Sequence, residues 1–173
     1  MTDLAERPVV RRVRPPDWPA LRGLRLEALA DTPIAFVETL EQARALDDAG
    51  WQGRAARGAD GGDCCQLLAF AGERAVATAV TFVEGGAGWL AAVYVSPAWR
   101  GRGLLAEMLA GCAAWAGGRG QPHLRLEVHE DNVRARAAYA RLGFVDTGVR
   151  RPYPLDRARQ EHLLQLDLGS PGE

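Results

Sequence analysis

The sequence predicts a three-layer α/β domain, in which a mixed, mostly antiparallel sheet of six to seven strands is flanked by about four helices. Apolar runs typical of strands alternate with segments of helical periodicity in the order β-α-α-β-β-β-α-β-α-β-β. The length of 173 residues is typical of one domain, so we assign residues 1–173 to a single domain. Hydrophobic residues make up 47% of the chain and charged residues 25%, which is an ordinary globular composition.

The first third of the chain predicts one strand and two helices. A Val-rich strand over 8–13 stops at Pro15 and Pro16. Asp17 is a good N-cap for a helix with apolar residues at helical spacing, and Pro33 ends that helix. A more polar helical stretch follows, over 39–57, and a glycine-rich loop closes it.

The rest of the chain predicts six strands and two helices. A turn at Gly72-Glu73 joins the first two of these strands, and an almost wholly apolar run after them is typical of a central strand. The predicted strands cover 64–70, 76–83, 89–95, 124–128, 144–149 and 162–168. The predicted helices run from Leu104 to Gly117 and from Asp131 through Leu142. Between the last two strands we expect a loop rich in Pro and Arg.

The composition excludes several classes of function. The net charge of −1 argues against a general nucleic-acid binder, and no apolar run approaches the ~18 residues of a membrane span. The chain has no Lys, which excludes Schiff-base catalysis and a P-loop lysine. Its three Cys and three His lack metal-ligand spacing. We expect a cytoplasmic protein that binds no metal, nucleic acid or membrane, and the sequence leaves a homodimer open.

A glycine loop lies between the central strand and the helix that follows it. Gly101 and Gly103 allow a tight turn with no Cβ in the way of a ligand. The unpaired N–H groups of the helix's first turn then form a site suited to pyrophosphate. A plain strand-to-helix turn is the alternative. The spacing Gly101-x-Gly103-x-x-Ala106 also matches a dinucleotide-binding fingerprint, but too little chain follows for the βα units that such a fold needs.

Two motifs together resemble the GNAT superfamily of N-acetyltransferases. The first is Val-x-Pro-x-x-Arg-Gly-x-Gly, formed by Val95, Pro97, Arg100, Gly101 and Gly103. The second is Asn-x-x-Ala-x-x-x-Tyr-x-x-x-Gly-Phe, which begins at Asn132 and ends at Phe144. The resemblance covers roughly 67–168. One departure is Leu105, since the family usually has Gly or Ala there, and we expect its side chain to point away from the phosphates.

The resemblance implies direct transfer of acetyl from acetyl-CoA to an amine, without a covalent acetyl-enzyme. It implies that the glycine loop holds the pyrophosphate and that the preceding strand pairs with the pantetheine arm. A strand N–H would polarise the thioester carbonyl. The implied cofactor-binding residues are Val93, Tyr94, Val95, Arg100, Gly101, Arg102, Gly103, Leu104, Leu105, Ala106, Asn132 and Tyr139.

Two residues of the second motif have expected roles. Asn132 would bind pantetheine or hold the neighbouring strand, and a role as N-cap or turn residue is the alternative, although we assign that role to Asp131. Tyr139 lies two helical turns beyond Asn132 on the same face. A phenol stays protonated at neutral pH and can donate a proton to the departing thiolate. Packing against the sheet is the alternative for Tyr139.

The general base is left open by the sequence. Glu127 lies in an apolar strand, and a carboxylate there needs a reason. The segment Leu126-Glu127-Val128 resembles the base-bearing strand of ribosomal-protein N-terminal acetyltransferases. The alternatives are a salt bridge from Glu127 to an Arg, or a water relay that needs no single base. Glu84 and Glu161 are further candidates.

The motifs do not specify the acceptor. The segments 30–39 and 150–159 would select it, with Glu38 and Asp156 able to hold a cationic amine and with Ile34, Phe36 and Tyr153 offering apolar contacts. A small-molecule amine is our first hypothesis and a protein N-terminus the second. A non-catalytic acetyl-CoA sensor is the alternative from another class.

Overall fold

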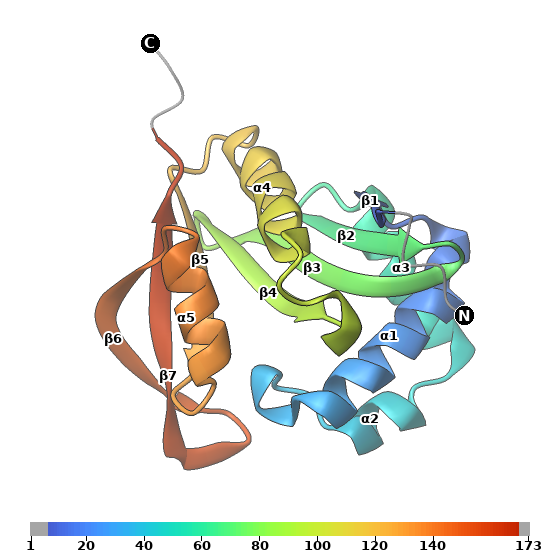
Figure 1. The fold of residues 1–173 in the computed structure, drawn as a ribbon, viewed down its shortest axis with the longest axis horizontal. Coiled ribbons are helices and arrows are strands. Elements are labelled where there is room, and N and C mark those ends of the chain that lie inside the picture. Colours follow the sequence, from blue (N-terminus) through green and yellow to red (C-terminus); the bar gives the residue numbers. More distant parts are fainter. Residues whose placement is uncertain (1–6, 170–173) are drawn as a thin grey trace.

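Seven strands form one sheet in the computed structural model, which describes residues 7–169 (Figure 1). The sheet order is β1-β2-β3-β4-β5-β7-β6, and every neighbouring pair is antiparallel except β4–β5. The strands are β1 Val9–Arg12, β2 Cys64–Ala71, β3 Arg74–Glu84, β4 Ala87–Val95, β5 His123–His129, β6 Val145–Tyr153 and β7 Asp156–Asp167. The mixed, mostly antiparallel sheet that the sequence predicts is therefore confirmed.

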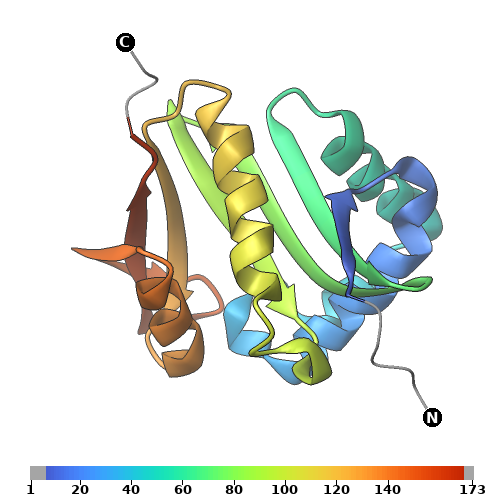
Figure 2. The ribbon, with the colours of Figure 1, turned by 45° about the horizontal axis from the view of Figure 1, so that its top comes forward.

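Helices cover both faces of this sheet and complete three layers (Figure 2). The helices are α1 Trp18–Asp31, α2 Leu40–Ala45, α3 Asp48–Asp60, α4 Leu104–Gly117 and α5 Val133–Arg141. Apolar residues of α4 and α5 pack on one face, with Met108 and Cys112 at the centre of that core. Residues of α1, α2 and α3 build a second core on the other face, around the fully buried Trp51.

The polar helical stretch expected over 39–57 is two helices, so α-helices number five among residues 7–169. Leu46 has an extended backbone that ends α2. The Asp47 carboxylate then accepts a hydrogen bond from the Gly50 N–H at 2.8 Å and caps α3. A side-chain cap of this kind satisfies a free N–H and starts a new helix.

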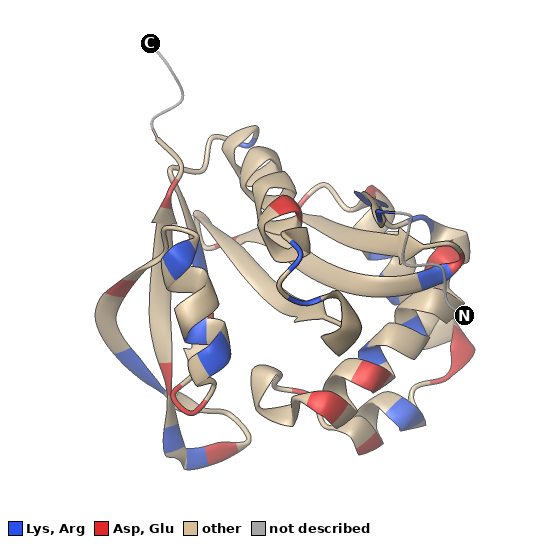
Figure 3. Ribbon diagram, in the orientation of Figure 1, with Lys and Arg blue, Asp and Glu red and all other residues tan. Residues whose placement is uncertain are grey.

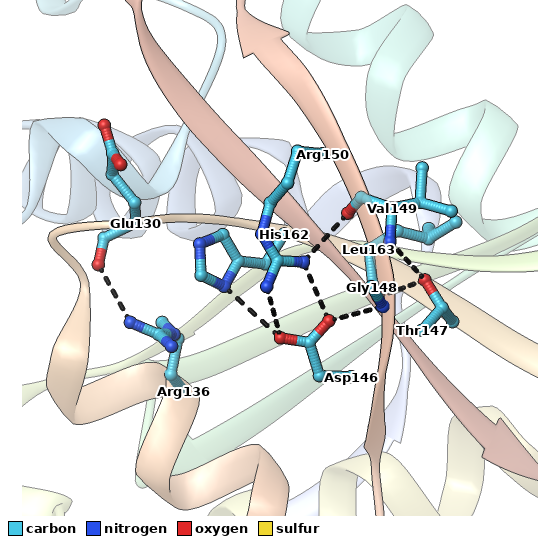
Figure 4. Close-up of polar contacts among 9 residues, drawn as sticks. All are labelled: Glu130, Arg136, Asp146, Thr147, Gly148, Val149, Arg150, His162 and Leu163. Carbon is cyan, nitrogen blue, oxygen red and sulfur yellow. Dashed lines mark hydrogen bonds and ion pairs between the residues drawn. The ribbon is translucent and has the colours of Figure 1, made fainter.

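The prediction of a Pro/Arg-rich loop around residues 150–159 is wrong. Strands β6 and β7 continue through this segment and meet at a turn at Pro154-Leu155. A register shift between Asp146 and Arg150 bends β6, and side chains hold the bend (Figure 4). Arg150 donates two hydrogen bonds of 2.8 Å to Asp146, and the Gly148 N–H donates to the same carboxylate at 2.9 Å. These contacts thus hold the bend of β6, and the strand continues beyond the end at residue 149 that the sequence predicts.

The parallel pair β4–β5 determines where the site lies. The two strands pair only at Gly88–Leu124 and Trp89–Arg125, and then diverge. From Leu90 onward, the side of β4 that faces β5 has no partner strand, while β3 still pairs with its other side. A bulge accompanies the divergence, with Ala92 at φ +51°.

Candidate active site

The glycine loop opens at the N-terminus of α4. Gly101 and Gly103 have φ of +71° and +81°, and a Cβ at either position would meet no atom within 4 Å. Positive φ favours glycine, and the open space leaves room for a ligand beside the backbone. The first N–H groups of α4 have no partner within the helix. This is the anion-binding geometry that the sequence predicts.

Arg100 fixes the loop rather than pointing freely into solvent. Its Nε donates to the Val95 carbonyl at 2.9 Å, and its Nη2 contacts the Asp31 carboxylate at the end of α1. The guanidinium of Arg100 thereby joins β4, the loop and α1. Its first contribution to the site is to position the backbone.

A pocket of about 370 Å³ lies between this loop, β4 and α5. All the cofactor-binding residues expected from the sequence line it, except Arg102 and Leu104. The Leu104 side chain is buried in the core, and the exposed Arg102 lies 5.3 Å from the centre of the Trp99 ring. Leu105 lies in the first turn of α4, packs against the core and forms part of the pocket wall.

Asn132 is itself the N-cap of α5, which corrects the assignment of that role to Asp131. The Asn132 Oδ1 accepts a hydrogen bond from the Ala135 N–H at 3.3 Å. Asp131 is instead ion-paired with Arg159. The Asn132 side chain also lines the pocket, and its amide nitrogen has no hydrogen-bond partner among residues 7–169. One side chain can therefore cap the helix and still donate to a ligand.

Tyr139 borders the same pocket from α5 and is 8% exposed. Its ring packs against Phe144, with ring centres 5.6 Å apart. Burial raises the pKa of the Tyr139 hydroxyl above its ordinary value, so the phenol keeps its proton at neutral pH. A protonated hydroxyl beside the pocket is a suitable proton donor.

Two basic side chains on the α5 side of the pocket were missed by the sequence reasoning. Arg134 and Arg141 line it from α5, and Figure 3 shows basic positions both on the loop before α4 and along α5. Their seven-residue spacing matches that of Asn132 and Tyr139, which was an available signal. The chain has 21 Arg residues and no Lys, so many pairs of Arg have such a spacing, and this pair does not stand out.

Glu127 projects from the opposite face of the sheet. Its neighbours Leu126 and Val128 face the core that contains Tyr139, so Glu127 faces the other way. Its Oε1 lies 2.6 Å from Nη1 of Arg151 on β6. The salt bridge to an Arg is one of the alternatives that the sequence left open.

The residues expected to contact the acceptor have mostly structural partners. The Tyr153 hydroxyl donates to the Phe36 carbonyl at 2.6 Å, and both side chains are buried. Glu38 is ion-paired with Arg25 at 2.9 Å and with Arg54 at 2.6 Å, so its charge is neutralised. Asp156 is exposed at the start of β7.

The thiols offer no nucleophile. Cys64, Cys65 and Cys112 are buried, and burial raises the pKa of each, to about 12 for Cys112. All three are therefore protonated at neutral pH, and a thiolate is the reactive form of cysteine. Between residues 7 and 169, no helix is long and apolar enough to cross a membrane, and no cluster of His, Cys, Asp or Glu could hold a metal ion.

Comparisons with known proteins agree with this geometry. A model of the acetyltransferase (GNAT) family matches residues 25–144. An aminoglycoside N(6')-acetyltransferase type 1 of Stenotrophomonas maltophilia is 31% identical over 147 residues, covering 83% of this chain and 90% of that protein.

Solved structures show the same fold at low sequence identity. A GNAT-family acetyltransferase from Streptococcus pneumoniae has a TM-score of 0.79 at 19% identity, covering 94% of this chain and 100% of that one. The PaiA N-acetyltransferase of Thermoplasma acidophilum, solved with coenzyme A, has a TM-score of 0.76 at 16% identity, covering 94% and 99%. The chain therefore belongs to the GNAT family and is an N-acetyltransferase.

Proposed function

We propose that this protein transfers the acetyl group of acetyl-CoA to a primary amine of a small molecule, by direct attack in a ternary complex. The observation that carries the proposal is the pocket that joins the glycine loop to Tyr139 along the unpaired side of β4. One ligand can place its phosphates at the helix N-terminus and its amide-bearing arm against the strand.

The anchoring of the cofactor would use backbone and charge together. The N–H groups at the start of α4 would bind the pyrophosphate, and Arg134 and Arg141 would add positive charge from α5. The pantetheine arm would pair with β4 around Val93 and Tyr94. The free amide nitrogen of Asn132 would donate to a carbonyl of that arm.

The chemical step would proceed where β4 and β5 diverge. The amine nitrogen forms a bond to the acetyl carbon, and the carbon–sulfur bond breaks. A backbone N–H at the bulge of β4 would polarise the thioester carbonyl. The Tyr139 hydroxyl would donate its proton to the departing thiolate, and Glu127 is the carboxylate that would meet the acceptor's ammonium group, directly or through one water.

The acceptor would approach from the face of the sheet that carries Glu127 and Trp89. A carboxylate attracts an ammonium group, and an aromatic ring beside it adds a cation–π contact. The relative that is 31% identical is named for acetylating aminoglycosides, which supports a small molecule with several amino groups. A protein N-terminus has no comparable support.

An amine panel tests this function. Purified protein with acetyl-CoA is offered aminoglycosides, polyamines, amino acids and short peptides, and CoA release is followed with a thiol reagent. We expect amine-dependent CoA release with one of the small amines and none with the peptides. Turnover with peptides alone would point to an N-terminal acetyltransferase. Tight acetyl-CoA binding without any turnover would point to a sensor.

A further inference from the structure

Glu161 is a buried carboxyl group that the mechanism above does not use. It lies in the middle of β7 and is 7% exposed. None of the hydrogen bonds or ion pairs formed within the described residues 7–169 involves its carboxylate. A mostly buried Glu side chain without an ionic partner is uncommon, which makes Glu161 a candidate for a role in the chemistry.

The ion pair between Arg151 and Glu127 spans the strand that carries Glu161. Strand β7 lies between β5 and β6, and Glu161 is paired in register with His129 on one side and Arg151 on the other. Arg151 nevertheless reaches Glu127 on β5, with 2.6 Å between Nη1 and Oε1. The guanidinium therefore crosses β7 on the face from which Glu161 projects. It also lies 5.9 Å from the centre of the Trp89 ring on β4.

The charged and titratable groups around Glu161 come from two strands. Glu127 and His129 face it from β5, and Arg151 and Tyr153 from β6. The Tyr153 hydroxyl is committed to the Phe36 carbonyl. The short turn Pro33–Ala35, which packs against β5, carries no charge. Burial and the negative charge of Glu127 raise the pKa of Glu161 to about 7, and Arg151 acts in the opposite direction.

We propose that Glu161 accepts the proton of the acceptor's ammonium group, and that the ammonium reaches it by displacing Arg151 from Glu127. The inference rests on the proposed function and divides two tasks between the carboxylates. Glu127, already neutralised by a cation, binds the incoming cation. Glu161, buried beside it and unpaired, removes the proton.

The proton balance of the step is complete. An N–H proton of the ammonium moves to Glu161, and the neutral amine forms the new carbon–nitrogen bond. The carbon–sulfur bond breaks, and the thiolate takes the Tyr139 proton. The second N–H proton lost on forming the amide passes through water to restore Tyr139, and Glu161 returns its proton to solvent as the product leaves.

The test is the pH dependence of kcat/KM for wild type, Glu161→Gln, Glu127→Gln and Arg151→Met. In wild type, kcat/KM should rise with pH around pH 7, as Glu161 loses its proton; this rise is the acidic limb of the profile. Glu161→Gln should lower kcat/KM at pH 7 roughly 100-fold and abolish that limb, with acetyl-CoA affinity unchanged. The rate that remains should rise only as the amine itself loses its proton. The exposed Glu73→Gln is the matched control and should reproduce the wild-type profile.

The two neighbouring variants should move the limb in opposite directions. Loss of the negative charge in Glu127→Gln should shift it to lower pH and raise KM, and loss of the positive charge in Arg151→Met should shift it to higher pH. If Glu161→Gln does not fold, the opposite shifts of the acidic limb in Glu127→Gln and Arg151→Met are sufficient to test the proposal. A folded Glu161→Gln variant that keeps the limb, or a limb abolished in Glu127→Gln instead, overturns the inference. Wild-type protein that acetylates no amine refutes the proposed function instead.

Discussion

Tyr139 is placed so that its chemistry can be separated from its packing. The ring lies against Phe144 in the core, while the residue borders the pocket. Tyr139→Phe keeps the ring and removes the donor, so we expect kcat to fall roughly 10- to 1000-fold while acetyl-CoA affinity changes little. Steady-state kinetics and calorimetric titration measure the two quantities. Unchanged kcat in the variant would assign Tyr139 to packing alone.

Single residues also show how far sequence reasoning reaches. Gly101 and Gly103 could be placed at the start of a helix from local spacing, whereas Asn132 and Tyr139 entered the predicted site through the motif that resembles the GNAT family. The contact of Arg151 with Glu127 could not be predicted, since it joins two strands with a third between them. Sheet order and register determine such contacts, and neither is readable from local periodicity.

At the scale of elements, the α2–α3 junction depends on one side chain. Asp47 caps α3 through its bond to the Gly50 N–H. We expect Asp47→Ala to lower the free energy of unfolding by about 0.5–2 kcal/mol, because the first turn of α3 loses the acceptor that caps it. Asp47→Asn keeps an acceptor oxygen and is the matched control. Urea denaturation followed by circular dichroism measures both, and equal losses would show that the cap contributes nothing.

Elements with strong periodicity could be predicted with their boundaries, whereas for β6 the sequence predicts a strand over 144–149 but neither its bend nor its continuation to Tyr153. The core helix α4 lies where its apolar face predicts, between two glycine-marked ends. Strand β6 is exposed along nearly its whole length, so no apolar alternation marks where it ends. Its bend is stabilised by the ion pair between Asp146 and Arg150. Such a pair leaves no hydrophobic periodicity in the sequence from which the bend could be predicted.

For the whole molecule, we expect stability to increase when the cofactor binds in the pocket between the glycine loop, β4 and α5. A ligand that binds only the folded state stabilises it by about 2.7 kcal/mol at 100 times its Kd. We expect acetyl-CoA to raise the Tm of wild type, to raise it less in Gly103→Asn, and not to raise it in Gly103→Asp. Both variants place a side chain at φ +81°, and only Asp adds a charge that repels phosphate.

Differential scanning fluorimetry with and without acetyl-CoA measures these shifts, and the Tm of each variant without ligand corrects for backbone strain. Asn tolerates positive φ about as well as Asp does. Equal shifts in the two variants would mean that no phosphate charge lies at the loop.

The divergence of β4 and β5 has a consequence for what can enter the molecule. An exposed strand edge with unpaired backbone N–H and C=O groups can pair with a strand of another chain, and such pairing leads to aggregation. Here the unpaired side of β4 borders a pocket, with α5 as a wall and the start of α4 at its end. A polypeptide carries side chains on alternating sides and needs room for them, whereas an unbranched chain with widely spaced amides is a narrower ligand. The walls around the unpaired edge of β4 thus restrict pairing with strands of other proteins, and the proposed cofactor would occupy the edge without such a strand.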